Sequence, residues 1–140
     1  KGAVYAGARL LMDKMAVDHV DRIVLAGAFG SYIDPKYAMV LGLIPDCSLS
    51  EVSAAGNAAG TGARIALLDK EARTEIARVV QDVEKIETAL DPNFQDQFVG
   101  AMAFPHKIHA FPHLSKEVTI PRQEAAGTLK RQRRGRRRQR

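Results

Sequence analysis

The sequence predicts an α/β fold, in which short buried strands alternate with helices. Three observations favour this class: an apolar run at residues 23–26, two glycines shortly after it, and a helix-start signal that follows at once. Residues 23–26 are too few for a helix and rich in large apolar side chains, which predicts a strand buried on both faces. Asp34 is a favoured N-cap and Pro35 suits the first helical position, so a short helix is expected over residues 35–41.

The two glycines of this unit, Gly27 and Gly30, let the chain turn sharply between strand and helix. Strand, glycine turn and helix in succession is the arrangement with which α/β proteins hold a nucleotide or phosphate. Close packing of a strand against a helix also selects glycine. The residues alone therefore leave ligand contact and plain packing open as explanations.

Before this unit, residues 1–16 have the apolar spacing of an amphipathic helix. Arg9 and Asp13 are expected on its polar side. The residues expected on its apolar face are Val4, Gly7, Ala8, Leu11 and Met15. The pattern predicts a packing helix, with a helix flanking a ligand cleft as the alternative.

A second glycine-rich segment follows a second expected strand at residues 51–55. Gly56, Gly60 and Gly62 would each cost a helix interior up to about 1 kcal/mol relative to Ala. Such clustering indicates close approach of the backbone, either to a ligand or to another helix. Either Asn57 or Thr61 is expected to cap the helix that runs to Leu68, and the sequence does not decide between them.

The remaining chain up to residue 114 is predicted to be mainly helical. Apolar residues at helical spacing predict a helix over residues 70–90, with a break near Asp82, and another over residues 93–103. Phe-Pro-His then occurs at residues 104–106 and again at 111–113. This segment is expected to be a loop packed by its phenylalanines.

Two features in the chain suggest metal or thiol chemistry at first sight. His106, His109 and His113 have a spacing that could ligate a metal, but the prolines prevent a helix that would fix it, and no carboxylate or Cys lies among them. No metal ligand is therefore assigned. Cys47, the one cysteine of the chain, has no His or Cys beside it and is expected to be an inert small residue.

Length and composition set broad limits. A chain of 140 residues is enough for one domain with a real core, and no window approaches the roughly 18 uninterrupted apolar residues of a membrane span. No secretory signal is visible and a single cysteine cannot form an internal disulfide, so a cytoplasmic location is expected. The helical pattern is already in progress at Lys1, which suggests a piece of a longer protein.

The formal charge of +5 belongs to the end of the chain. Residues 129–140 hold eight of the 21 Lys and Arg residues and no acidic residue, so residues 1–128 alone carry −3. Basic tails can bind RNA, DNA or anionic membrane. Because no aromatic residue lies among the arginines to stack on bases, residues 115–140 are expected to be a disordered, solvated tail rather than a nucleic-acid site.

Three stretches together carry a family resemblance. These are LAGAFGSYIDPKYAMVLGLIPD at residues 25–46, GNAAGTGARIALL at residues 56–68 and FQDQFVGAMAFPH at residues 94–106. They resemble the C-terminal part of the ATP-dependent reductive activators of corrinoid proteins. These activators belong to the superfamily of acetate and sugar kinases, heat-shock chaperone ATPases and actin. The resemblance covers residues 1–106 and leaves out the arginine tail.

The resemblance implies half of an RNase H-like, actin-like ATPase domain over residues 1–114, with a helical C-terminal extension. It implies a parent protein that uses ATP and Mg²⁺ to return Co(II) corrinoid to Co(I) for a corrinoid-dependent methyltransferase. A [2Fe–2S] cluster would lie in a ferredoxin domain missing here. Matching the superfamily's adenosine turn assigns nucleotide contact to these positions: Gly27, Ala28, Phe29, Gly30 and Ser31. Gly60 and Gly62 are placed beside the site.

The chain also departs from the family. The superfamily's phosphate-binding turns and catalytic acids would precede Lys1, and the four cluster-binding cysteines are absent. The superfamily's adenosine turn usually has two adjacent glycines, whereas here Ala28 follows Gly27. No catalytic residue is therefore assigned, and this piece alone is expected to be inactive. Other possibilities stay open: a docking or homodimerisation module with a degenerate nucleotide site, a nucleic-acid binder acting through its tail, or an acyl-CoA dehydratase activator with a [4Fe–4S] cluster between subunits.

Overall fold

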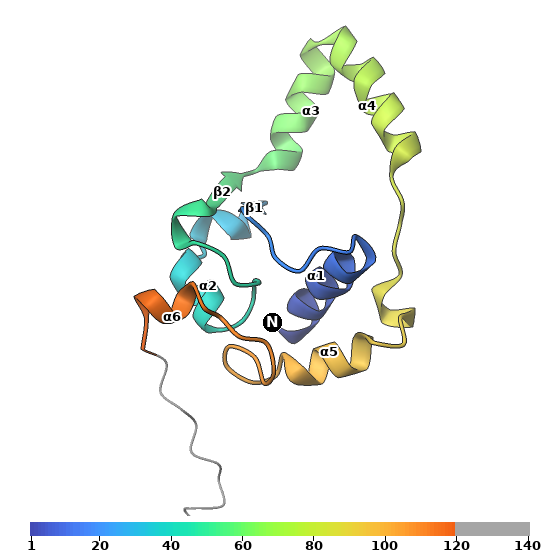
Figure 1. The fold of residues 1–140 in the computed structure, drawn as a ribbon. Helices are drawn as coiled ribbons and strands as arrows, with labels where there is room; N and C mark the ends of the chain where they lie inside the picture. Colours follow the sequence, from blue (N-terminus) through green and yellow to red (C-terminus); the bar gives the residue numbers. More distant parts are fainter. Residues whose placement is uncertain (120–140) are drawn as a thin grey trace, which may run out of the picture.

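The computed structural model describes residues 1–119, apart from the Phe29 side chain, and confirms the α/β class. Figure 1 shows helices arranged around a small two-stranded sheet. The helices are α1 (Gly2–Lys14), α2 (Pro35–Val40), α3 (Ala58–Leu68), α4 (Lys70–Asp82), α5 (Phe94–Gly100) and α6 (Leu114–Glu117). The strands are β1 (Ile23–Ala26) and β2 (Val52–Gly56), and the 3-10 turns are η1 (Phe29–Tyr32), η2 (Leu49–Glu51) and η3 (Thr88–Leu90).

Strands β1 and β2 pair in parallel, with Ile23 opposite Val52 and Ala26 opposite Gly56. The prediction that the first strand is buried on both faces is wrong. Its burial alternates, and Val24 is half exposed, because the described residues supply only these two strands and cover one face. A parallel sheet is ordinarily covered on both faces, so this one has an open face.

The core lies between the sheet, α1, α2 and the C-terminal loop. Met39 of α2 and Leu114 of α6 are completely buried, so the core joins segments that are far apart in the sequence. The Asp34 carboxylate caps α2 by accepting hydrogen bonds from the N–H groups of Lys36 and Tyr37, as its position before Pro35 predicts. Among residues 1–119, no helix is both long enough and apolar enough to cross a membrane.

Helix α1 buries a different face from the one predicted. Its buried residues are Gly2, Tyr5, Ala6, Leu10 and Met12. Val4, Leu11 and Met15 of the expected face are exposed. The reason is tertiary: α1 packs along α5, where Gly2 contacts the Phe98 ring, and the Tyr5 hydroxyl is 2.9 Å from His109 Nδ1. Apolar periodicity located the helix but could not show which of its apolar stripes the neighbouring elements cover.

Several predicted boundaries shift. The helix expected over residues 70–90 ends at Asp82, where the break was anticipated, and the helix expected over 93–103 is shorter at both ends. The tail was expected to start at residue 115, but residues 115–117 complete α6. They do so because the Asp46 carboxylate accepts hydrogen bonds from the N–H groups of His113 and Leu114. The arginine-rich segment lies outside the described residues.

Candidate functional site

The carboxyl ends of β1 and β2 bring the two glycine-rich segments together. Each strand leads into a glycine with left-handed backbone geometry, Gly27 with φ of 103° and Gly56 with φ of 62°. The Gly27 N–H donates a 2.7 Å hydrogen bond to the Gly56 carbonyl oxygen. In open α/β sheets, ligands bind at this edge, outside the carboxyl ends of the strands. The structure thus joins the two segments that the sequence singled out.

Gly27 and Gly30, the two glycines of the first turn, are favoured at their positions for different structural reasons. A Cβ on Gly30 would lie 2.9 Å from the Leu25 carbonyl oxygen, so close packing of η1 against β1 requires glycine there. Around Gly27, the described residues other than its two chain neighbours place no atom within 4 Å of the Cβ position. Its positive φ alone therefore favours glycine. The packing explanation therefore applies to Gly30, whereas the space beside Gly27 is open.

The start of α3 forms the other side of this edge. Of the two expected caps, Asn57 is the one used: its Oδ1 accepts a 3.0 Å hydrogen bond from the Gly60 N–H. A Cβ on Gly60 would lie 2.7 Å from the Asn57 side chain, so the cap explains this glycine. At Gly62, no described atom outside the nearby backbone of α3 lies within 4 Å of the Cβ position. Ser31, in η1, has its hydroxyl 3.7 Å from the Cβ position of Gly56, which places η1 against the end of β2.

The chemistry available at this edge is neutral. Residues 27–31 and 56–62 contain no ionisable side chain and offer backbone N–H groups, amide and hydroxyl groups. The N-terminal end of a helix presents unpaired N–H groups and a partial positive charge, which suit an anionic or polar ligand. This edge can therefore hold and orient a ligand. Proton transfer or metal binding would have to come from residues elsewhere.

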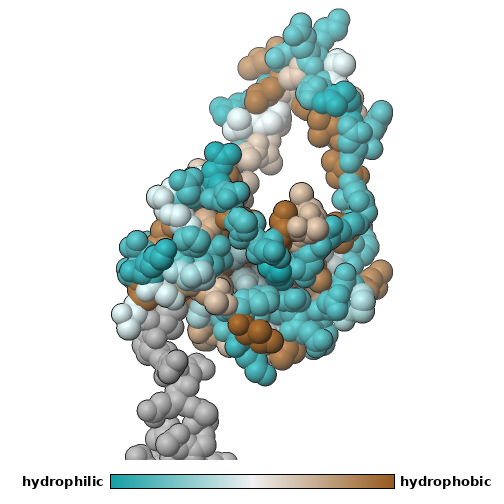
Figure 2. Space-filling model, in the orientation of Figure 1, coloured by the Kyte–Doolittle hydropathy of each residue, from teal (hydrophilic) through white to brown (hydrophobic). Residues whose placement is uncertain are grey.

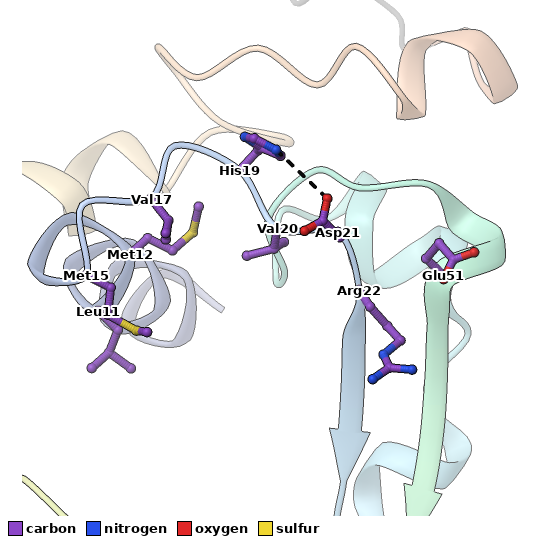
Figure 3. A pocket seen from close by; sticks show the side chains of 9 residues that line it. All are labelled: Leu11, Met12, Met15, Val17, His19, Val20, Asp21, Arg22 and Glu51. Atoms are coloured by element: carbon purple, nitrogen blue, oxygen red, sulfur yellow. Dashed lines mark ion pairs between the residues drawn. The ribbon is translucent and has the colours of Figure 1, made fainter.

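A separate hollow of about 680 Å³ lies at the opposite end of the strands. Figure 3 shows Arg22 and Glu51 at the amino ends of the two strands, whose arrows run away from the hollow. Leu11 and Met15 of α1 line its apolar side, and His19 on its rim is 3.9 Å from the Asp21 carboxylate. This hollow is not part of the edge with the glycine turns.

In the C-terminal loop, His106 and His109 contact each other, whereas His113 has a different partner. His106 Nδ1 accepts hydrogen bonds from the N–H groups of Ile108 and His109, and the His106 and His109 rings stack with centroids 4.1 Å apart. His113 Nδ1 donates to the Asp46 carboxylate. Within residues 1–119, no three or more His, Cys, Asp or Glu side chains gather in a way that could hold a metal ion.

Cys47 and His106 both sit in environments that favour their neutral forms. Burial, followed by the nearby Asp46 charge, raises the pKa of the Cys47 thiol, so less of it is the reactive thiolate. Burial, reinforced by His109 and Lys1, lowers the pKa of His106 to about 4. The buried His106 Nε2 has no hydrogen-bond partner within residues 1–119. Neither residue lies at the edge with the glycine turns, and the His106 environment was not anticipated from the sequence.

The fold and the glycine-lined edge define the class of protein. Residues 1–115 match the family described as the C-terminal domain of RACo, the ASKHA domain. The match covers most of the chain, and with the parallel strands and their glycine turns it identifies part of an actin-like ATPase fold, as the resemblance implied. This chain belongs to the RACo C-terminal domain family.

Two relatives give the family context. The corrinoid activation enzyme RamQ of Eubacterium limosum is 38% identical over 101 residues, which are 71% of this chain and 17% of that protein. A solved structure named reductive activator for corrinoid, iron–sulfur protein superposes with a TM-score of 0.71 at 33% identity, covering 84% of this chain and 18% of that one. The chain therefore spans less than a fifth of the length of either relative.

An iron–sulfur cluster, which the resemblance implied for another domain, does not fit the residues of this chain. A [2Fe–2S] cluster of the ferredoxin type needs four thiolates, and the sequence has one cysteine. That cysteine, Cys47, is buried and donates a hydrogen bond to the Ser48 carbonyl. No step of the chemistry is assigned to a cluster here.

Proposed function

We propose that this chain is the C-terminal portion of a longer, cytoplasmic iron–sulfur protein that returns Co(II) corrinoid to Co(I). One electron would reach the cobalt through a [2Fe–2S] cluster outside this chain, and ATP would drive this uphill transfer. The names of both relatives support this reaction class, because both describe the activation of corrinoid or of a corrinoid protein. The partner would be a corrinoid protein that serves a methyltransferase. The same names favour this proposal over the acyl-CoA dehydratase type of activator. The arginine tail stays a separate question, since it lies outside the described residues.

Within that protein, this chain contributes one wall of the nucleotide site. The observation that carries this role is the open edge where left-handed glycines lie directly after β1 and at the last position of β2. The hydrogen bond from the Gly27 N–H to the Gly56 carbonyl oxygen joins them. Gly27, with Ala28 to Ser31, contacts the adenosine part of ATP. Gly60 and Gly62 lie beside the site at the start of α3. Neutral donors suit a base or sugar, and the Mg²⁺–phosphate contacts come from turns outside this chain.

The first experiment is a calorimetric titration of the full-length protein with Mg–ATP. Gly27→Val fills the space that the structure leaves open and adds backbone strain, so its ATP affinity should fall by about tenfold or more. Gly7→Val is the matched control, because its Cβ position is equally open but lies on α1. Thermal unfolding of both variants checks that each is folded.

The titration also distinguishes the ATPase proposal from the alternative of a docking module with a degenerate nucleotide site. If the full-length wild-type protein binds no Mg–ATP, the ATPase proposal is wrong and a docking module with a degenerate site replaces it. If both variants bind ATP as the wild type does, a nucleotide site exists but does not involve the turn at Gly27.

A further inference from the structure

Helices α3 and α4 form a hairpin that buries none of its residues, although all of them lie in the described part of the chain. Helix α3 is apolar around almost its whole circumference and carries one charged residue, Arg64. Leu67 and Leu68 are about four-fifths exposed. A helix that is apolar on all sides is normally buried in the core of a protein. Its exposure here leaves its apolar surface without a partner among residues 1–119.

Helix α4 is amphipathic, and its apolar stripe is exposed as well. The stripe consists of Ala72, Ile76, Val79 and Val80, and Val83 extends it past the end of the helix. Val79 is 43% exposed and Val80 is 65% exposed. Arg78 and Gln81 lie on the opposite side, where Arg78 pairs with the Glu75 carboxylate at 2.7 Å. Regular spacing of four to five apolar residues indicates selection for burial, which a solvated helix would not need.

The hairpin stands apart from the rest of the molecule. Apart from each other, α3 and α4 make no extensive contact with another helix or strand of residues 1–119. Figure 1 shows the hairpin projecting beyond the sheet and the chain after it returning towards α5, which leaves an opening between the hairpin and α1. Figure 2 shows hydrophobic residues along the sides of the hairpin that border this opening. Asp69 makes the corner: it follows the last residue of α3, and its carboxylate caps α4 through the N–H groups of Glu71 and Ala72.

We propose that the apolar surface of the α3–α4 hairpin is the docking surface for the part of the same polypeptide that precedes residue 1. This rests on the proposed function, in which the chain is part of a longer protein. The occupant is an apolar helix or sheet face of that preceding part, packed against the α4 stripe and the exposed leucines of α3.

Three observations favour this occupant over a second copy of the chain. More than four-fifths of each relative lies outside the matched region, which supplies ample polypeptide. In the solved relative, the region that superposes on 84% of this chain with a TM-score of 0.71 is part of that much longer chain. The parallel sheet also has one open face beside Val24, which further strands and helices of the same domain would cover. The same preceding part of the polypeptide would cover both the apolar surface of the hairpin and the open face of the sheet.

Docking there has a consequence for the nucleotide site. Helix α3 starts at the Asn57 cap beside the glycine turns and runs for 11 residues, roughly 16 Å, to the corner at Asp69. A rigid helix fixed at its far end is also fixed at its start. The docked polypeptide therefore positions the N–H groups that α3 presents to the nucleotide.

The test is hydrogen exchange of the α4 amides in the full-length protein, followed by mass spectrometry. In the wild type, peptides from residues 70–82 should exchange at least about tenfold more slowly than expected for a solvated helix. Val79→Asp should remove this protection. Gln81→Asp is the matched control: it adds the same charge near the same helix end but on the polar side, and should keep the protection. Val79→Ala, a milder change, should give an intermediate loss.

Two outcomes would overturn the proposal. One is rapid exchange of α4 in the full-length wild type. The other is protection that appears only in a dimer and is lost on dilution to the monomer, which would assign the surface to a second copy. Mg–ATP titration of the same sample keeps the two proposals apart: ATP binding with an unprotected α4 contradicts the docking proposal alone, and a protected α4 without ATP binding contradicts the proposed function alone.

Discussion

Asp46 and His113, 67 positions apart in the chain, are joined by two hydrogen bonds of 2.9 Å. The Asp46 Oδ2 accepts from both the backbone N–H and the ring Nδ1 of His113, while its Oδ1 accepts from the Leu114 N–H at 3.0 Å. The carboxylate thereby caps α6 from a distant loop and holds the fully buried Leu114 in the core. The end of the described fold depends on this side chain.

Asp46→Ala should lower the free energy of unfolding by about 2 kcal/mol. The substitution removes three hydrogen bonds to a charged group that is only 10% exposed, and it leaves the donors of α6 without a partner. Asp21→Ala is the control: Asp21 is almost fully exposed and should change stability by less than about 0.5 kcal/mol. Urea unfolding measures both. Equal effects of the two changes would show that Asp46 does not anchor α6.

Gly42→Ala should be among the most destabilising single changes in the chain. A Cβ at this position would lie 1.9 Å from the backbone carbonyl oxygen of Pro105, and its φ of 66° adds strain for any other residue. We expect a loss of about 3 kcal/mol in urea unfolding, because a backbone atom cannot move aside as a flexible side chain can.

Gly7→Ala provides the contrast. Gly7 lies within α1, and outside the helix's own nearby backbone no atom of the described residues lies within 4 Å of its Cβ position. Alanine should therefore stabilise the helix by about 0.5–1 kcal/mol. A Gly7→Ala variant that loses stability would indicate that another segment of the full-length protein packs closely on α1 there.

Stability should fall as the pH is lowered from 6.5 towards 4, with His106 as one cause. Burial, together with the neighbouring His109 and Lys1, lowers the pKa of His106 from its ordinary value of 6.5 to about 4 in the folded state. The unfolded chain binds a proton at His106 through this range before the folded protein does. The stability that the neutral ring supports is thus fully present above pH 6.5 and lost by about pH 4.

His106→Asn should flatten this dependence, since the Asn oxygen can replace Nδ1 as the acceptor for Ile108 and His109 without titrating. His19→Asn, at a side chain that is 80% exposed, should leave the slope unchanged. Urea midpoints recorded from pH 7 to pH 4 give the comparison. If His106→Asn retains the wild-type slope, other groups account for the acid sensitivity.

Local signals in the sequence predicted much of the fold. Asp34 before Pro35, Asn57 before a run of small residues, and the apolar run at 23–26 each specify their element through nearby atoms, and each element is present. The face that α1 buries and the position of α6 depend on α5 and on Asp46. These partners are dozens of residues away, so local periodicity could not identify them.

The assignment of a nucleotide site to the two glycine segments stays a prediction. The structure brings these segments together, and it shows reasons for their glycines that the sequence could not. Gly27, Gly30 and Gly60 look alike in the sequence. The distances from each Cβ position show that a side chain at position 30 would clash with the Leu25 backbone, and one at position 60 would clash with the Asn57 side chain. Gly27 is the position of the three with open space and a positive φ. Such distinctions need three-dimensional neighbours.

The most direct test of the central proposal is a reduction assay with the full-length protein, a Co(II) corrinoid protein and a reductant under anaerobic conditions. The loss of the Co(II) absorption band is followed with and without Mg–ATP, for the wild type and for Gly27→Val. We expect ATP-dependent formation of Co(I) by the wild type and a strongly reduced rate in Gly27→Val. Equal rates with and without ATP in the wild type would show that the protein does not use ATP for this reduction.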